Sequence, residues 1–325
     1  MRNVPHRSPT AVGETPDPYP SAVTWMRRLL LLNVVVEVLI VVTGGLVRLT
    51  GSGLGCPTWP QCVPGSYTPV AHQAEGYHRY IEFGNRTLTG LVGWVALAAL
   101  YAVWRWSGPQ REQWYAVWRG WGSARRDLVV PAVVVLAGVV AQAVIGGITV
   151  LTGLNPLIVS AHFLVSMVLV ASASLAYYRS QLPAGPAPLA VHPLVHRLGL
   201  VTCVVAGVVL ALGTVVTGSG PHSGDAETPA RYGFDPRTIS WLHADAVMLF
   251  VGLVVAVWLA ARLTAPTSLP ARGWAAVFGV TLLQGAVGYT QYFTGLPWVV
   301  VLGHMLLASL LVVALVRAMV ALRRV

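Results

Sequence analysis

The chain has 325 residues, of which 55% are hydrophobic and 10% are charged, whereas soluble domains carry about 25% charged residues. This composition excludes a water-soluble enzyme and predicts a polytopic membrane protein that lies in the lipid bilayer. The 21 basic residues, all arginine, outnumber the 11 acidic ones. They form short runs between apolar stretches instead of one basic face, so the sequence predicts no nucleic-acid partner.

The first 24 residues contain five prolines and few large apolar side chains, which predicts a disordered tail over 1–24. Eight apolar segments follow, and each is long enough to cross a bilayer as a helix, which takes about 20 residues. The sequence therefore predicts an all-α membrane protein with eight transmembrane helices, placed near 27–48, 80–104, 129–150, 157–178, 195–217, 238–260, 273–293 and 297–319.

The arginines indicate how these helices are oriented. Of the 21, 16 lie at the helix ends on the side of the two termini and 5 lie on the opposite side. Because cytoplasmic loops carry an excess of positive charge, this distribution predicts a multi-pass protein of the cell membrane with both termini in the cytoplasm. The first, third, fifth and seventh connections would then face outward.

The chain also repeats itself. A shift of 142 residues superposes Gln142, Gly146, Thr152, Gly153, Leu154 and His162 on Gln284, Gly288, Thr294, Gly295, Leu296 and His304 without a gap. The sequence therefore predicts two similar four-helix bundles, an N-terminal half over 25–180 and a C-terminal half over 181–325. Such repeats place functional sites at equivalent positions of the two halves.

Three histidines lie inside the predicted spans, one to two turns from the outward end of the fourth, sixth and eighth helices: His162, His243 and His304. Ionisable groups within a membrane are costly and often functional. Facing histidines on two bundle helices are typical ligands of haem iron. The alternative is that each histidine only forms hydrogen bonds to a neighbouring helix.

The second helix opens with Glu82, Asn85 and Arg86. Glu82 and Arg86 are four residues apart and share a helix face, so they form either an ion pair or a site in which Glu82 exchanges protons with a reactive cavity. When the second helix is aligned with the sixth by depth in the membrane, Asn85 occupies the position of His243. The first half would then offer one histidine where the second half offers two.

The first outward loop contains Cys56 and Cys62 in a C-x5-C arrangement. On the oxidising face of a membrane this pair is either a disulfide that supports the loop or a redox-active couple. Two cysteines are too few for a structural zinc site, which takes four ligands.

These motifs resemble the heme A synthase family. The resemblance rests on the string GGLVRLTGSGLGCP from Gly44 to Pro57, on WPQC from Trp59 to Cys62, on the helix led by Glu82, and on the placement of the three histidines. It covers about residues 27–320. Members of this family oxidise a methyl group of haem O to a formyl group, giving the haem A of terminal oxidases.

The resemblance implies an oxidoreductase with two haem sites. His243 and His304 would hold the iron of a haem b in the C-terminal half, while His162 would bind the iron of the substrate haem O in a pocket shared with Asn85 and Arg86. Glu82 would be catalytic. Dioxygen and haem iron would perform two successive hydroxylations, the resulting diol would lose water, and electrons would enter through haem b from an unidentified donor.

Two further expectations follow from the resemblance. Haem O would come from the synthase that makes it, and Arg48 and Arg79, placed near the outward surface, are candidates to pair with haem propionates. The family commonly has Glu-x-x-His in the second helix, but here Asn85 replaces the histidine, which puts bis-histidine binding of the substrate iron in doubt. An alternative function is that of a membrane di-haem cytochrome b that only carries electrons, although it would require paired histidines in both halves.

Overall fold

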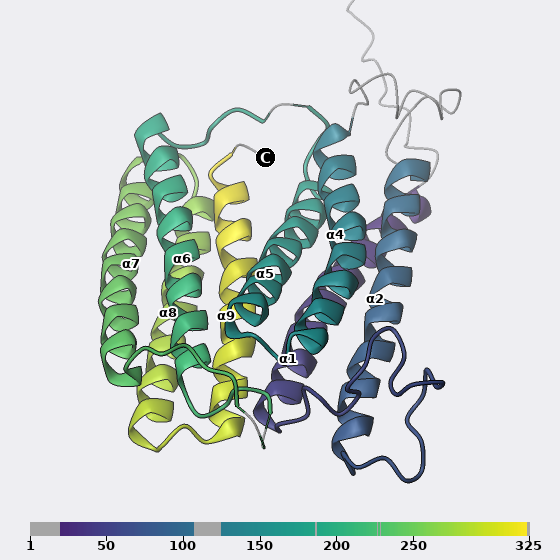
Figure 1. The fold of residues 1–325 in the computed structure, drawn as a ribbon. Helices are drawn as coiled ribbons and strands as arrows, with labels where there is room; N and C mark the ends of the chain where they lie inside the picture. Colours follow the sequence, from purple (N-terminus) through teal and green to yellow (C-terminus); the bar gives the residue numbers. More distant parts are fainter. Residues whose placement is uncertain (1–19, 107–124, 186, 226, 228, 324–325) are drawn as a thin grey trace, which may run out of the picture.

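A computed structural model of the chain describes residues 20–106, 125–185, 187–225, 227 and 229–323. These residues form eight helices and no strand (Figure 1). The helices are α1 (Pro20–Leu49), α2 (His78–Trp106), α4 (Arg126–Leu151), α5 (Pro156–Arg179), α6 (Pro193–Ser219), α7 (Pro236–Thr264), α8 (Leu269–Phe293) and α9 (Trp298–Ala321). The eight predicted helices are thus confirmed, and each observed helix contains most or all of its predicted range.

The start of α1 differs from the sequence prediction. The helix begins at Pro20, so residues 20–24 are helical and the predicted tail over 1–24 extends too far. The physical reason is that proline is well tolerated in the first turn of a helix, where its missing N–H has no intrahelical acceptor. Residues 1–19, the rest of the predicted tail, lie outside the described residues.

Several helices begin with a polar cap followed by proline. The side chains of Asn155 and Asp235 accept hydrogen bonds from the backbone N–H groups of Leu157 and Thr238, and a proline follows each cap. This arrangement satisfies an otherwise free helical donor and sets the backbone angle of the next residue. The caps explain why these two helices start one and two residues, respectively, before their predicted apolar ranges.

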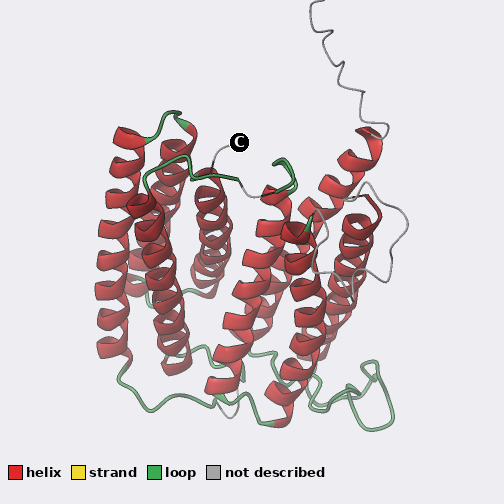
Figure 2. Ribbon diagram, turned by 90° about the horizontal axis from the view of Figure 1, so that it is seen from above, coloured by secondary structure: helices red, strands yellow, loops and turns green. Residues whose placement is uncertain are grey.

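Seven of the helices are long and apolar enough to cross a membrane. The helix outside this group is α8, in which four glycines and two glutamines dilute the apolar residues. It nevertheless packs between α7 and α9. The chain is therefore a multi-pass membrane protein built from eight packed helices, whose connections gather at the two ends of the helices (Figure 2).

The helices form two groups that lie side by side (Figure 1). Helices α1, α2, α4 and α5 pack in a ring, and α6, α7, α8 and α9 form a second ring. The two rings meet through α5, α9, α1 and α6. Each has a buried apolar core of its own, and a smaller cluster containing Val41, Met167 and Val312 fills the seam between them.

The internal repeat is visible in hydrogen bonds as well as in sequence. The Gln142 side chain donates to the His162 carbonyl at 2.8 Å, and Gln284 donates to the His304 carbonyl at 3.0 Å. The turns that follow α4 and α8 also match, because Leu154 and Leu296 both adopt positive φ, at 58° and 61°. The same contacts thus join the last two helices of each half.

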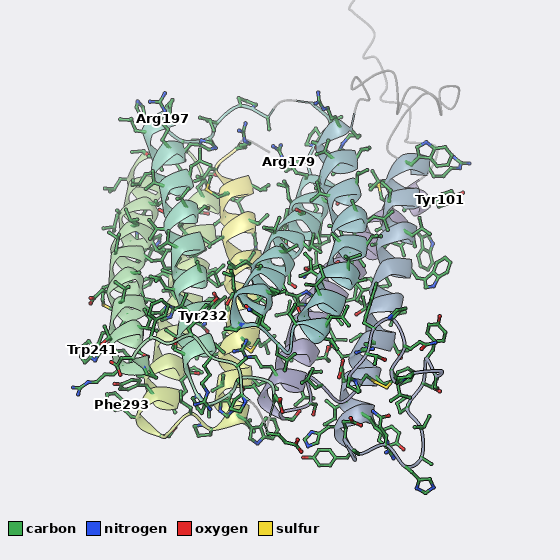
Figure 3. The ribbon with its side chains drawn as sticks, in the orientation of Figure 1. Tyr101, Arg179, Arg197, Tyr232, Trp241 and Phe293 are labelled. Carbon is green, nitrogen blue, oxygen red and sulfur yellow. A yellow bond between two sulfur atoms is a disulfide. The ribbon has the colours of Figure 1, made fainter. Side chains whose placement is uncertain are left out.

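The two ends of the bundle differ in their side chains. Arg179 and Arg197 lie at the end that also holds the α5–α6 connection, whereas Trp241 and Phe293 lie toward the opposite end (Figure 3). The C-terminal segment joins the first of these ends, where the Ala190 N–H donates to the Leu322 carbonyl. We call the end that holds Arg179 and Arg197 the C-terminal end of the bundle. We call the opposite end, where the Cys56–Cys62 loop lies, the loop end.

Candidate functional site

The three intramembrane histidines lie at matching depths near the loop end. His162 and His304 each come six residues after the first residue of α5 and α9, and His243 comes seven residues after the first residue of α7. Asn85 also comes seven residues after the first residue of its helix, α2. The predicted equivalence of Asn85 and His243 therefore agrees with their positions in the helices.

Each of these histidines faces a glycine on the preceding helix. A β-carbon built at Gly146, Gly213 or Gly288 would lie 3.4, 3.3 or 3.2 Å from the Cε1 atom of His162, His243 or His304, respectively. The missing side chains let each imidazole lie against the neighbouring helix backbone. Three helix pairs thus hold an imidazole in the same way.

The rings are only partly exposed, and their Nδ1 atoms are the buried ones. In all three histidines Nδ1 is buried and has no hydrogen-bond partner. Each ring keeps an exposed edge on which a ligand could bind. The predicted role as iron ligands and the alternative of purely structural histidines both stay predictions.

The second half presents two such imidazoles, His243 from α7 and His304 from α9. In the first half, α5 presents His162, but the equivalent position on α2 carries Asn85. The Asn85 Oδ1 atom accepts a hydrogen bond of 2.8 Å from the Thr43 hydroxyl of α1. One half thus offers a pair of imidazoles, and the other offers one imidazole and an amide bound to its neighbouring helix.

Glu82 is buried one turn closer to the loop end than Asn85 and has three strong donors. Its Oε2 accepts from the Cys56 N–H at 2.6 Å, and its Oε1 accepts from the Arg86 Nε at 3.0 Å and from the Arg86 Nη2. The predicted Glu82–Arg86 ion pair is therefore present. Because three charge-assisted hydrogen bonds hold the carboxylate, its position is fixed relative to the first loop.

Arg86 extends this link to the loop backbone. Its Nη1 donates to the Thr58 carbonyl at 2.9 Å, and its Nη2 donates to the Cys56 carbonyl at 2.7 Å. Cys56 and Cys62 form a disulfide, and both residues are fully buried. The loop therefore folds onto α2 around the ion pair, as the disulfide alternative predicted, and the possibility of redox cycling stays a prediction.

Trp59, within the disulfide-closed segment, lies over α4. A β-carbon at Gly147 would overlap the Trp59 indole, so the ring rests directly on the helix backbone. Gly147 neighbours Gly146, which faces His162. The disulfide loop thus touches α2 through Glu82 and α4 through Trp59, and α4 is the helix whose Gly146 faces His162.

The two propionate candidates also contact backbone carbonyls at the loop end of the bundle. Arg48 donates from Nε to the His222 carbonyl at 2.8 Å and from Nη2 to the Thr217 carbonyl at 3.1 Å. Arg79 donates to the carbonyls of Gln73 and Ala71. Both arginines lie at the loop end, as predicted, and their binding to propionates stays a prediction.

A family model described as cytochrome oxidase assembly protein (COX15-CtaA) matches residues 27–223. The chain belongs to this family. Similar curated proteins are the heme A synthase of Geobacillus thermodenitrificans, 32% identical over 130 residues that cover 40% of this chain and 34% of that protein, and the heme A synthase of Lysinibacillus sphaericus, 25% identical over 290 residues that cover 84% of this chain and 87% of that protein. The chain thus spans about a third of the length of the Geobacillus relatives that it matches and most of the Lysinibacillus one.

Family membership agrees with the resemblance inferred from the first loop and from the helix led by Glu82, since both fall within the matched residues. The match also includes His222, which sequence analysis did not single out. His222 accepts the Arg48 hydrogen bond through its carbonyl, and its Nε2 pairs with the Leu296 carbonyl at 2.9 Å. His222, in the α6–α7 connection, thus links the end of α1 to the α8–α9 connection. No local pattern in the sequence predicted that role.

Glu37 is a second residue whose surroundings the sequence left open. It is buried near the middle of α1, and its Oε1 has no hydrogen-bond partner. Asn33, one turn earlier, is also buried with an unpaired Oδ1. The two residues form a polar patch inside the first half, distant along α1 from the loop-end site.

Proposed function

We propose that this protein is a heme A synthase, an oxidoreductase that converts a methyl group of haem O to a formyl group. The observation that carries the proposal is the set of three partly exposed imidazoles at matching depth, each with an orphaned Nδ1 and a facing glycine. Membership in a family with relatives named heme A synthase supports the same reaction. Two hydroxylations of the methyl carbon give a diol, which loses water to leave the aldehyde.

The C-terminal half, 181–325, is assigned to a prosthetic haem b. His243 and His304 fit this group because imidazole nitrogen is a common axial ligand of haem iron and because both rings keep an exposed edge. When bound, haem b would supply the one-electron chemistry that brings reducing equivalents to the reaction. Gly213 and Gly288 hold the two rings against the neighbouring helices, and the Gln284 side chain ties α8 to α9 beside His304.

The N-terminal half, 25–180, is assigned to the substrate haem O. His162 is the imidazole available to its iron, and Asn85, bound to Thr43, leaves the opposite position without a strong ligand. A substrate has to leave after oxidation, and a single imidazole holds iron less firmly than a pair. The asymmetry between the halves therefore suits one permanent cofactor and one exchangeable substrate.

Glu82 is assigned to proton transfer at this pocket. Oxygen chemistry consumes protons, and a positioned carboxyl group is a common general acid or base. Arg86 and the Cys56 N–H hold the Glu82 carboxylate in place. The disulfide loop, resting on α2 and α4, would exclude bulk water from the pocket.

Orientation and partners complete the proposal. The positive-inside rule places both termini in the cytoplasm, so the loop end and both haem sites lie toward the outer face. Arg48 and Arg79 are assigned to haem propionates at that end. Haem O would arrive from the synthase that produces it, and a separate donor would supply electrons to haem b.

Pigment extraction from the purified protein tests the proposal. Protein expressed with a source of haem O should contain haem b together with haem O or haem A, identified by chromatography and mass spectrometry. Time-dependent formation of haem A under air and a reductant establishes the activity. Haem b as the sole pigment, with no haem A formed, would instead favour the di-haem cytochrome b.

A further inference from the structure

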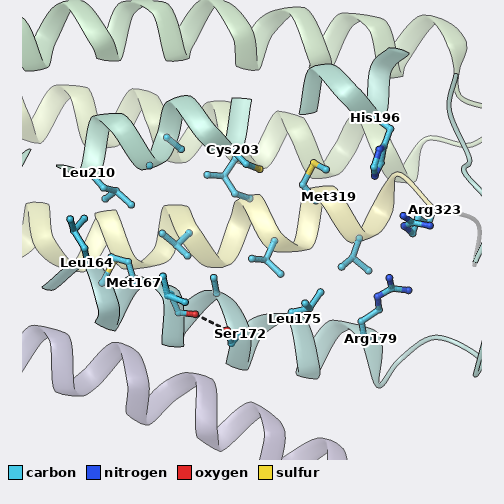
Figure 4. Close-up of a pocket in the computed structure, with 18 residues that line it drawn as sticks. Leu164, Met167, Ser172, Leu175, Arg179, His196, Cys203, Leu210, Met319 and Arg323 are labelled. Carbon is cyan, nitrogen blue, oxygen red and sulfur yellow. Dashed lines mark hydrogen bonds between the residues drawn. The ribbon is translucent and has the colours of Figure 1, made fainter. Parts of the chain in front are cut away.

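A cavity of about 560 Å³ lies between the two halves and runs from the C-terminal end of the bundle as far as Leu164 and Leu210 (Figure 4). Its walls come from α5 of the first half and from α6 and α9 of the second half. Ligand pockets commonly have volumes of about 300–1,000 Å³, so the cavity is large enough for a bound molecule. None of the proposed haem ligands lines it.

The cavity has one cationic end and an apolar body. Arg179, His196 and Arg323 gather at the C-terminal end of the bundle, while Leu164 and Leu210 lie at the far end (Figure 4). The side chains between them are mostly aliphatic or sulfur-containing, including Cys203 and Met319, and the one hydroxyl, that of Ser172, donates to the Val168 carbonyl. A molecule that matches this lining has an anionic head and an apolar tail.

No carboxylate of the described residues neutralises the cationic end. Among the described residues, neither Arg179 nor Arg323 forms an ion pair with a carboxylate, and the one side-chain hydrogen bond of Arg323 goes from Nη1 to the Ala187 carbonyl. Two uncompensated guanidinium groups that face one opening attract an anion strongly, because phosphate can accept from both.

The length of the cavity agrees with a lipid chain. Its lining on α6 runs from His196 to Leu210, a distance of about 21 Å at 1.5 Å per residue. Half of the hydrocarbon core of a bilayer is about 15 Å thick, so the cavity is long enough to hold an acyl chain over the full depth of one leaflet, and its lining continues past the midplane. It begins at the level of the arginines, where lipid headgroups lie.

We propose that this cavity binds one acidic phospholipid of the leaflet at the C-terminal end. Its phosphate lies between Arg179 and Arg323 beside His196, and an acyl chain follows α6 past Cys203 toward Leu210. Basic pockets between transmembrane helices are known to bind acidic headgroups. Since the walls come from both halves, the bound lipid also links the N-terminal bundle to the C-terminal bundle.

The test measures lipid retained by the full-length protein in nanodiscs of phosphatidylcholine, with or without phosphatidylglycerol. After extraction into mild detergent, native mass spectrometry counts bound phosphatidylglycerol. Each of Arg179→Gln and Arg323→Gln should weaken retention about fivefold, the effect expected of one arginine near an anionic membrane surface. Arg197→Gln is the matched control, because Arg197 is exposed at the same end of α6 and does not line the cavity.

A second variant tests the apolar part of the cavity while both arginines are kept. Gly207 lines the cavity, and a β-carbon there would meet no atom within 4 Å, so Gly207→Phe should fold, occupy the apolar body and abolish retention with both arginines intact. Phosphatidylglycerol should raise the thermal unfolding temperature of the wild type and not that of Gly207→Phe, and inorganic phosphate should produce no such rise. Equal retention by all variants, an equal rise with inorganic phosphate, or haem O recovered from the cavity in place of lipid would overturn the proposal.

Discussion

The two halves of the molecule use one helical framework for unequal sites. In both, a glutamine on the third helix holds the carbonyl of the histidine on the fourth, and a glycine faces that imidazole. On the second helix, however, the C-terminal half has His243, whereas the N-terminal half has Asn85 bound to Thr43. A repeated scaffold thus keeps the position of a ligand while changing its chemistry, which suits a fixed cofactor in one half and an exchangeable substrate in the other.

The first loop adds a second inequality. Only the N-terminal half carries the Glu82–Arg86 pair and the disulfide segment that rests on it. The corresponding α6–α7 connection instead reaches across to the first half, where the Tyr232 hydroxyl contacts Ser160 at 3.2 Å. The first loop therefore covers groups of its own half, whereas the α6–α7 connection of the second half helps to join the two halves.

The largest expected effect is the loss of haem b from the second half when either of its two imidazoles is removed. His243→Ala or His304→Ala is expected to eliminate the low-spin haem b spectrum of the purified protein, because each would leave the iron with one ligand from the protein. His72→Ala, in the exposed part of the first loop, is the control and should keep the spectrum. An unchanged haem b content in both site variants would disprove the assignment.

Glu82→Gln should stop the reaction while leaving the second half intact. The variant keeps the shape of the side chain but removes its titratable group, so haem A formation should fall about 10²-fold or more and haem O should accumulate. Haem b content serves as the internal control. If Glu82 only balanced the charge of Arg86, the double variant Glu82→Gln/Arg86→Gln would recover activity, and that recovery would contradict the catalytic role.

Asn85→His would make the first half resemble the second. It places an imidazole at the register of His243 and removes the acceptor of the Thr43 hydroxyl. We expect tighter retention of haem O with a six-coordinate, low-spin signal in electron paramagnetic resonance, together with slower formation of haem A. Asn85→Ala, which also loses the Thr43 bond, separates the two effects, and identical behaviour of the two variants would argue against ligation by the new histidine.

Loss of the disulfide should lower the stability of the first half without releasing haem b from the second half. Cys56→Ser/Cys62→Ser releases a short closed segment, which costs about 2–3 kcal/mol of unfolding free energy by chain-entropy arguments. Thermal unfolding should begin at a lower temperature while haem b is retained, and Cys203→Ala should show no such shift. Complete inactivity combined with unchanged stability would indicate a redox role for the pair instead.

The smallest expected effect is a shift of the haem b absorption when a glycine of α8 is replaced. Gly288→Ala brings a β-carbon to 3.2 Å from the His304 Cε1, so the imidazole has to move slightly and the haem b absorption should shift. Gly285→Ala meets no atom within 4 Å and should leave the spectrum unchanged while stabilising the helix by up to about 1 kcal/mol. A shift of equal size in both variants would show that the contact with His304 is unimportant.

The sequence by itself determined the helices, their repeat and the depth of the histidines. In a bilayer every backbone polar group has to be satisfied within its own segment, so an apolar run of sufficient length becomes a helix whatever its neighbours are. The register of the repeat then fixed His162 against His304, and the depth of the residues in their helices set Asn85 against His243. Even the Glu82–Arg86 pair followed from a spacing of four residues.

Only the tertiary structure decided what those groups touch. The donation from the Cys56 N–H to Glu82, the Thr43–Asn85 bond, the glycine opposite each imidazole and the bridge from Arg48 to His222 all join segments distant in sequence. The cavity between α5, α6 and α9 likewise exists only because the two halves meet at that seam. Periodicity shows which face of a helix is apolar, but the choice of neighbour depends on side-chain packing between helices, which no single segment encodes.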